Sequence, residues 1–157
     1  GTILRECRAA AEILQNDYGI PADVFSVTSF SELRREALSC ERWNMLHPDA
    51  KNPRVPYVQQ CLKGRTGPVI AATDYMRTVP DQIRQWVSGR YVTLGTDGYG
   101  RSDSRAALRR FFEVDRNYIT LAALKALADD GKIDIATVSG AIRKLGIDPE
   151  KPDPWTV

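Results

Sequence analysis

The chain has 157 residues, of which 43% are hydrophobic and 27% are charged, and this composition predicts one globular domain with a substantial core. It contains neither a long apolar run nor a signal-peptide pattern, which argues against a membrane protein and against export. A formal net charge of +2 gives little of the electrostatic attraction that a dedicated nucleic-acid binder uses.

The first third of the chain predicts two helices with a strand between them. The first helix ends at Gly19 and has its apolar face at Leu4, Cys7, Ala11 and Leu14. Residues 23–28 carry Val24, Phe25 and Val27 nearly back to back, which is typical of a strand covered on both faces. Ser29 and Glu32 form a capping box, so the second helix is expected at residues 30–46.

The rest of the chain predicts two further strands and more helices. Residues 47–67 contain three prolines and read as connection, with a short helix possible at residues 57–62. Strands are expected at residues 68–73 and 90–94, joined by a helix that has Pro80 in its first turn or at a kink. Three helices should follow, with apolar stripes at Leu108, Phe111 and Phe112, then at Leu121, Leu124 and Leu127, then at Ile135, Val138, Ile142 and Leu145. Strands that alternate with helices predict an α/β fold whose largely parallel sheet has helices on both faces.

Residues 92–104 read as a strand that runs through a glycine-rich loop into a helix. The loop nearly matches three nucleotide-binding motifs and departs from each. A nucleotide-hydrolase phosphate loop needs Lys where Arg101 stands, and a dinucleotide fingerprint needs Gly where Asp103 stands. A thiamine diphosphate motif needs Gly where Thr96 stands and Asn residues downstream, where Ala122–Ala126 has none. An independent nucleotide-binding enzyme nevertheless stays open as an alternative.

The simpler interpretation of the loop is a shaped turn. Gly95, Gly98 and Gly100 would allow positive φ angles, Ser102 would cap the next helix and Asp103 would complement its dipole.

Other candidate groups favour structural roles. Arg101, Arg105 and Arg109 recur every four residues and predict a basic stripe that could dock an acidic partner. His47 is the single histidine and has no nucleophile beside it in the sequence. The three cysteines, Cys7, Cys40 and Cys61, lie far apart and outside metal-ligand spacing, so we expect free thiols that fill the core.

Several longer stretches of the sequence identify a protein family more specifically than the spacing of apolar residues does. Together they resemble the C-terminal region of the homodimeric, bacterial-type pyruvate dehydrogenases, which belong to the transketolase-like, thiamine diphosphate-dependent enzymes. The matching strings are residues 23–33, 41–48, 54–57, 72–76 and 94–105, and the similarity continues through residues 112–115 into the terminal helices.

The resemblance implies an enzyme that decarboxylates pyruvate and acetylates the lipoyl group of the dihydrolipoyl acetyltransferase component. Thiamine diphosphate and Mg²⁺ would be its cofactors, a second copy of the subunit its partner, and the cytoplasm its location. In the family, the catalytic, cofactor-binding and metal-binding residues belong to preceding domains. We therefore expect none in this chain, no bound cofactor, and no activity of the chain by itself.

The resemblance also implies a fold and a role for residues 1–157 as one domain of a larger enzyme. The fold is a three-layer, mostly parallel sheet with one antiparallel strand, in which a strand before Gly1 is expected to be missing. The role is to support the dimer and the catalytic domains. A possible interface loop comprises Thr96, Asp97, Gly98, Arg101 and Asp103. The alternative is an interaction module that docks a partner through the arginine stripe.

Overall fold

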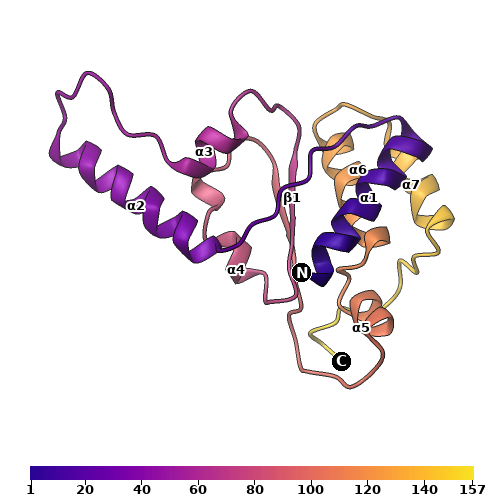
Figure 1. The fold of residues 1–157 in the computed structure, drawn as a ribbon. Coiled ribbons are helices and arrows are strands. Elements are labelled where there is room, and N and C mark those ends of the chain that lie inside the picture. The colour runs from indigo at the N-terminus through magenta and orange to yellow at the C-terminus, as the bar shows by residue number, and fades with distance from the viewer.

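The computed structural model describes all residues 1–157, which form helices on both sides of a small sheet (Figure 1). The sheet has two parallel strands, β1 (Val69–Ala72) and β2 (Tyr91–Leu94), with Val69 opposite Tyr91 and Ala72 opposite Leu94. The longer sheet with one antiparallel strand that we expected is not seen. No helix in the structure combines the length and the apolar character that crossing a bilayer requires.

One face of the sheet is covered by helices from both ends of the chain. They are α1 (Thr2–Tyr18), α5 (Arg105–Phe111), α6 (Arg116–Asp129) and α7 (Ile135–Lys144). Ile70, Ala72 and Leu94 point to this side, where Ile3, Ala10 and Phe112 complete the cluster. A second cluster joins α1, α6 and α7 around Leu124, which is fully buried. Helix α6 lies in the middle of this half, so it contributes to both clusters.

The opposite face of the sheet is covered by the middle of the chain. Its elements are α2 (Phe30–Leu46), α3 (Tyr57–Leu62), the single turn α4 (Thr78–Asp81) and a 3₁₀ turn, η1 (Arg84–Trp86). Val69, Ala71 and Tyr91 meet Ala37, Val58 and Trp86 here. The far end of α2 extends away from the rest of the molecule (Figure 1).

Most expected helices occur where the sequence placed them. Helices α1, α2 and α3 match their predicted ranges, and Gly19 ends α1 with a φ of 66°. The Ser29 hydroxyl caps α2 by accepting a hydrogen bond from the Glu32 amide at 3.2 Å. The helix expected after β1 is broken into α4 and η1, with Pro80 inside the first turn of α4.

The predicted strand at residues 23–28 is wrong. All of residues 21–28 are exposed and none takes part in a backbone–backbone hydrogen bond. Val24, Phe25 and Val27 are 40%, 46% and 41% exposed. The segment runs extended and crosses in front of β1 in Figure 1. It lacks a partner strand within the chain, so its apolar pattern has nothing to pair with.

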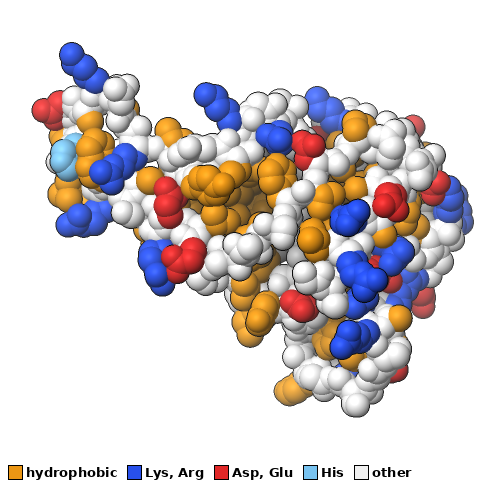
Figure 2. Space-filling view, in the orientation of Figure 1, with side chains coloured by type: hydrophobic (Ala, Val, Ile, Leu, Met, Phe, Trp, Pro, Cys, Tyr) orange, Lys and Arg blue, Asp and Glu red, His pale blue; other side chains and the backbone are white.

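The apolar face of α1 is also rotated from its expected position. The side chains buried toward the core are Ile3, Glu6, Ala10 and Leu14, of which only Leu14 was expected. Leu4 and Ala11 instead line an open groove of about 370 Å³ together with Val24 and Ser26. Figure 2 shows hydrophobic side chains gathered on the surface in the middle of this face of the molecule.

Candidate functional site: the glycine loop and its surroundings

The glycine loop, residues 95–104, leaves the carboxyl end of β2 and lies beside residues 73–77, which leave the carboxyl end of β1. Because the two strands are parallel, both loops emerge at the same end of the sheet. In open α/β sheets this end is where ligands usually bind. The loop is therefore the natural place to test the sequence prediction.

The first part of the loop is tied to its neighbour by backbone contacts. The Thr96 amide donates to the carbonyl of Tyr75 at 2.9 Å, and the Thr96 hydroxyl donates to that of Asp74 at 2.8 Å. A Cβ on Gly95 would lie 2.6 Å from the Tyr75 carbonyl oxygen and 2.7 Å from the Arg77 nitrogen. Glycine is required at position 95 because the backbone of residues 75–77 leaves no room for a Cβ there, and not because of a positive φ.

Asp97 is occupied by an intramolecular partner. Its Oδ1 accepts a hydrogen bond from the Arg77 amide at 3.1 Å, and its Oδ2 lies 3.2 Å from the Arg77 Nε. Both side chains are half-buried. Asp97 therefore holds the loop to the segment after β1, and its carboxylate is not free to bind a cation.

The second part of the loop differs from the predicted turn. Gly98 has a φ of 109°, whereas neither Gly95 nor Gly100 has a positive φ. Helix α5 is capped by Ser104, whose hydroxyl accepts from the Ala107 amide at 3.2 Å, and not by Ser102. Asp103 Oδ1 accepts from the Ser104 amide at 2.6 Å. The cap lies two residues later than predicted because the helix begins only at Arg105.

The predicted basic stripe does not form. Arg101 lies in the loop before α5, and its guanidinium sits 4.1 Å from the centre of the Phe111 ring. Arg109 points inward and pairs with Glu6 on α1 at 3.2 Å. Arg105 pairs with no other side chain. Because Arg101 lies outside α5 and Arg109 pairs with Glu6, the three arginines do not form one stripe on a helix.

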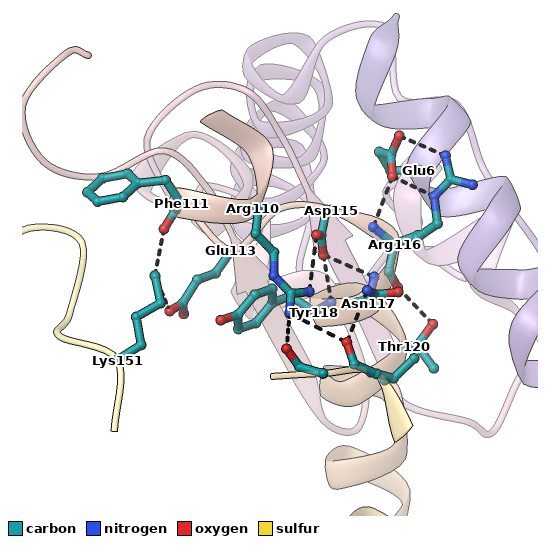
Figure 3. A network of polar contacts seen from close by, with 12 residues as sticks. Glu6, Arg110, Phe111, Glu113, Asp115, Arg116, Asn117, Tyr118, Thr120 and Lys151 are labelled. Carbon is teal, nitrogen blue, oxygen red and sulfur yellow. Dashed lines mark hydrogen bonds and ion pairs between the residues drawn. The ribbon is translucent and has the colours of Figure 1, made fainter. Parts of the chain in front are cut away.

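Glu6, which no sequence motif singled out, is a carboxylate on the core-facing side of α1 whose side chain is 7% exposed (Figure 3). Its two oxygens accept from the Arg116 backbone amide at 3.0 Å and from the Arg116 guanidinium at 3.0 and 3.2 Å. Hydrogen bonding from Arg116 lowers the pKa of Glu6 despite its burial, and Glu6 in turn raises the pKa of Arg116. The sequence did contain a signal for this role, because Glu6 is spaced three residues from Ile3 and four from Ala10 and so shares their face of the helix.

The α5–α6 junction contains a second polar cluster (Figure 3). Asp115 caps α6 by accepting from the amides of Asn117 and Tyr118, both at 3.0 Å. Arg110 bridges Asp115 and the carbonyl oxygens of residues 145 and 146 at the end of α7. Each charged group has a partner within the chain, so the cluster joins helices and leaves no donor or acceptor set facing a cavity.

What the loop region does present to solvent is aromatic and apolar. Tyr99 is 82% exposed at the tip of the loop, and Tyr75, Met76 and Trp155 are each more than half exposed around it. Such a cluster suits contact with another protein surface better than phosphate binding.

The remaining candidates have structural surroundings. Cys40 is buried, Cys7 and Cys61 are half-buried, and all three are free. Burial raises the pKa of Cys7 and of Cys40, which opposes thiolate chemistry. His47 stacks on Trp43 with ring centres 4.2 Å apart and its Nδ1 lies 2.8 Å from the Trp43 carbonyl oxygen.

The residues present do not fit thiamine diphosphate or Mg²⁺. No group of three or more His, Cys, Asp and Glu side chains is placed to hold a metal ion. The loop acids are engaged by Arg77 and by the Ser104 amide, and the loop amide of Thr96 already has an acceptor.

Residues 1–115 match the family described as the transketolase-like TK C-terminal domain. The chain is 63% identical to a pyruvate dehydrogenase E1 component of Pseudomonas aeruginosa, over 98% of this chain and 18% of that protein. The corresponding proteins of Cupriavidus necator and Escherichia coli K12 are 54% and 53% identical, over 100% and 98% of this chain and 17% of each relative. The chain thus spans less than a fifth of the length of these relatives.

Proposed function

Because this chain belongs to the transketolase-like TK C-terminal domain family, we propose that it is the C-terminal domain of a pyruvate dehydrogenase E1 component. The observation that carries the proposal is 63% identity to such a protein along nearly the whole chain. The complete enzyme would decarboxylate pyruvate and pass the acetyl group to the lipoyl group of a dihydrolipoyl acetyltransferase in the cytoplasm. The three free thiols favour that reducing location.

The cofactor chemistry would belong to the part of the enzyme outside these residues. Thiamine diphosphate, held with Mg²⁺, supplies the carbanion that such decarboxylation needs. The proposed role of residues 1–157 is to support the dimer and the catalytic domains.

The proposal includes a larger sheet in the complete enzyme. The amides of Val69 and Thr73 donate to β2, so the alternating amides of Ile70 and Ala72 face the free edge of β1. Val24, Phe25 and Val27 lie unpaired in an extended segment, and Leu4 and Ala11 line the groove beside it. One additional apolar strand between β1 and residues 23–28 would accept hydrogen bonds from these amides and would cover these apolar side chains.

Hydrogen exchange tests this strand. In the isolated chain, we expect the amides of Ile70 and Ala72 to exchange quickly, while Ala71, whose amide faces β2, stays protected. In the longer protein, Ile70 and Ala72 should gain protection, and so should the alternate amides of residues 24–28 that face the added strand. Equal exchange of Ile70 and Ala72 in both proteins would rule out the added strand.

The activity has a separate test. The longer protein, supplied with pyruvate, thiamine diphosphate and Mg²⁺, should acetylate a lipoyl domain, and the isolated chain under the same conditions should not. No turnover by the longer protein would overturn the enzyme assignment. Turnover by the isolated chain would overturn the supporting role alone.

A role for the glycine loop at the subunit contact is part of the proposal. The support is the cluster of exposed side chains at Tyr75, Met76 and Tyr99. Tyr99→Ala in the longer protein should weaken dimerisation in sedimentation measurements. Met45→Ala, which removes an exposed apolar side chain on α2, is the control and should leave it unchanged. Unaltered dimerisation in Tyr99→Ala would place the contact elsewhere.

A further inference from the structure

The C-terminal segment, residues 151–157, crosses the glycine loop at Gly98. A Cβ on Gly98 would lie 2.9 Å from the Pro154 carbonyl oxygen and 3.1 Å from the Trp155 Cα. Pro154 is buried by this contact, although the residues on either side of it are exposed. The Trp155 ring centre lies 5.7 Å from the guanidinium carbon of Arg77, the residue that holds Asp97.

The same segment is anchored at its other end close to the loop. The Lys151 ammonium donates to the Phe111 carbonyl at 2.7 Å and to Glu113 at 2.9 Å (Figure 3). Phe111 also receives Arg101 of the loop, whose guanidinium carbon lies 4.1 Å from the ring centre. The tail and the loop therefore share a support at Phe111 and touch each other at Gly98.

The loop has little else to fix its shape. Residues 97–103 take part in no backbone–backbone hydrogen bond, and the loop has one such bond before them, at Thr96. Gly100 has no non-local atom near the position of a Cβ. A segment with so few internal bonds adopts one conformation only where surrounding groups hold it. The surrounding groups are Arg77 on one side and the tail on the other.

We propose that residues 151–157 form a strap that holds the glycine loop in its conformation and thereby fixes the exposed position of Tyr99. The strap lies beyond residues 1–115, which match the family model, and the inference does not depend on the activity proposed above. A binding event that displaced residues 154–157 would release the loop and leave the contacts of Lys151 with Phe111 and Glu113 in place.

The test is hydrogen exchange in the longer protein that carries this domain. Deletion of residues 154–157 should speed exchange of the amides of Thr96 and Arg77 by about tenfold or more, since these amides donate the hydrogen bonds to Tyr75 and Asp97 that hold the base of the loop. Trp155→Ala, which keeps the backbone at Gly98, should give a smaller increase. Val157→Ala is the control and should change little, because Val157 is 49% exposed and the atoms nearest to Gly98 belong to Pro154 and Trp155. Amides of α6, such as those of Ile119 and Leu124, report on the rest of the domain and should be unaffected.

A double-mutant cycle makes the test independent of exchange. Gly98→Ala should destabilise the intact protein more than the protein without residues 154–157, because only the former has the Pro154 carbonyl in the way. Unchanged loop exchange after the deletion would overturn the strap. An equal rise in the α6 amides would also overturn it, because the tail would then support the whole domain and not the loop.

Discussion

Glu6 shows how one side chain can join elements that are distant in sequence. It lies on α1, yet its carboxylate accepts hydrogen bonds from the backbone and the side chain of Arg116 at the start of α6, and from Arg109 on α5. Asp115 caps the same helix, so two carboxylates meet the positive end of the α6 dipole. The contact of α1 with α6 therefore combines apolar packing with a charged clamp.

Replacing Glu6 by Gln should destabilise the domain by about 2–4 kcal/mol, because Arg109 and the Arg116 amide lose a charged acceptor in a largely buried position. Urea unfolding of the isolated chain followed by circular dichroism would measure the change. Glu12→Gln, on the exposed side of the same helix, is the control and should cost within about 0.5 kcal/mol. Equal effects of the two changes would contradict the clamp.

The stabilisation by Glu6 should depend on pH. The folded pKa of Glu6 is lowered by Arg116, so folding favours the ionised carboxylate. Its contribution is then complete above the unfolded pKa, near 4.5, and is lost as the pH falls through the folded value. The difference in unfolding free energy between the wild type and Glu6→Gln should shrink below pH 4.5. A difference that stayed constant down to pH 3 would contradict the assignment.

Gly95 and Gly100 make a matched pair within one loop. A Cβ on Gly95 meets the backbone of residues 75–77, whereas a Cβ on Gly100 meets nothing within 4 Å. We expect Gly95→Ala to cost about 1–3 kcal/mol through displaced backbone, and Gly100→Ala to be close to neutral. Thermal unfolding of the two variants would compare them directly. A greater loss in Gly100→Ala would contradict the described path of the loop.

At the scale of elements, α5 shows how a short helix depends on its ends. It has seven residues and none of them is fully buried, so its start at Ser104 matters more than its packing. Short helices are marginal without capping or tertiary contacts.

Ser104→Ala should therefore destabilise the domain by about 1 kcal/mol through loss of the cap, while Ser102→Ala should have little effect. The comparison separates the observed cap from the one that the sequence predicted. Differential scanning calorimetry of both variants would decide between them, and a larger loss in Ser102→Ala would restore the earlier assignment.

At the scale of the whole molecule, the sheet is small for the helices around it. Two strands carry helices on both faces, β1 has a free edge, and residues 21–28 have no backbone partner. A free edge and a nearby unpaired segment are sites for another strand.

Val24→Ser should accordingly behave differently in two contexts. In the isolated chain the side chain is 40% exposed, so we expect a change within about 0.5 kcal/mol. In the longer protein, where the proposed strand would bury it, the unfolding midpoint should fall by several degrees. Thermal scans of both proteins provide the measurement, and an equal shift in both would argue against the added strand.

The sequence by itself determined most of the helices, the two strands of the sheet and the family. Apolar periodicity, the Ser29 cap and the glycine that ends α1 are local signals, and local signals fix where a helix begins and ends. The family came from long strings of residues in the right order, which no single motif provided. The departures of the loop from the nucleotide-binding motifs could also be recognised in the sequence, since each depends on the residue type at a single position.

Only the tertiary structure decided which groups meet. The clamp at Glu6, the pairing of Asp97 with Arg77 and the tail at Gly98 each join residues more than 15 positions apart, and no local pattern encodes such pairs. The strand expected at residues 23–28 failed for the same reason, because a strand exists only where another lies beside it. The arginine stripe failed because Arg101 lies in the loop before α5 and Arg109 turns inward to pair with Glu6.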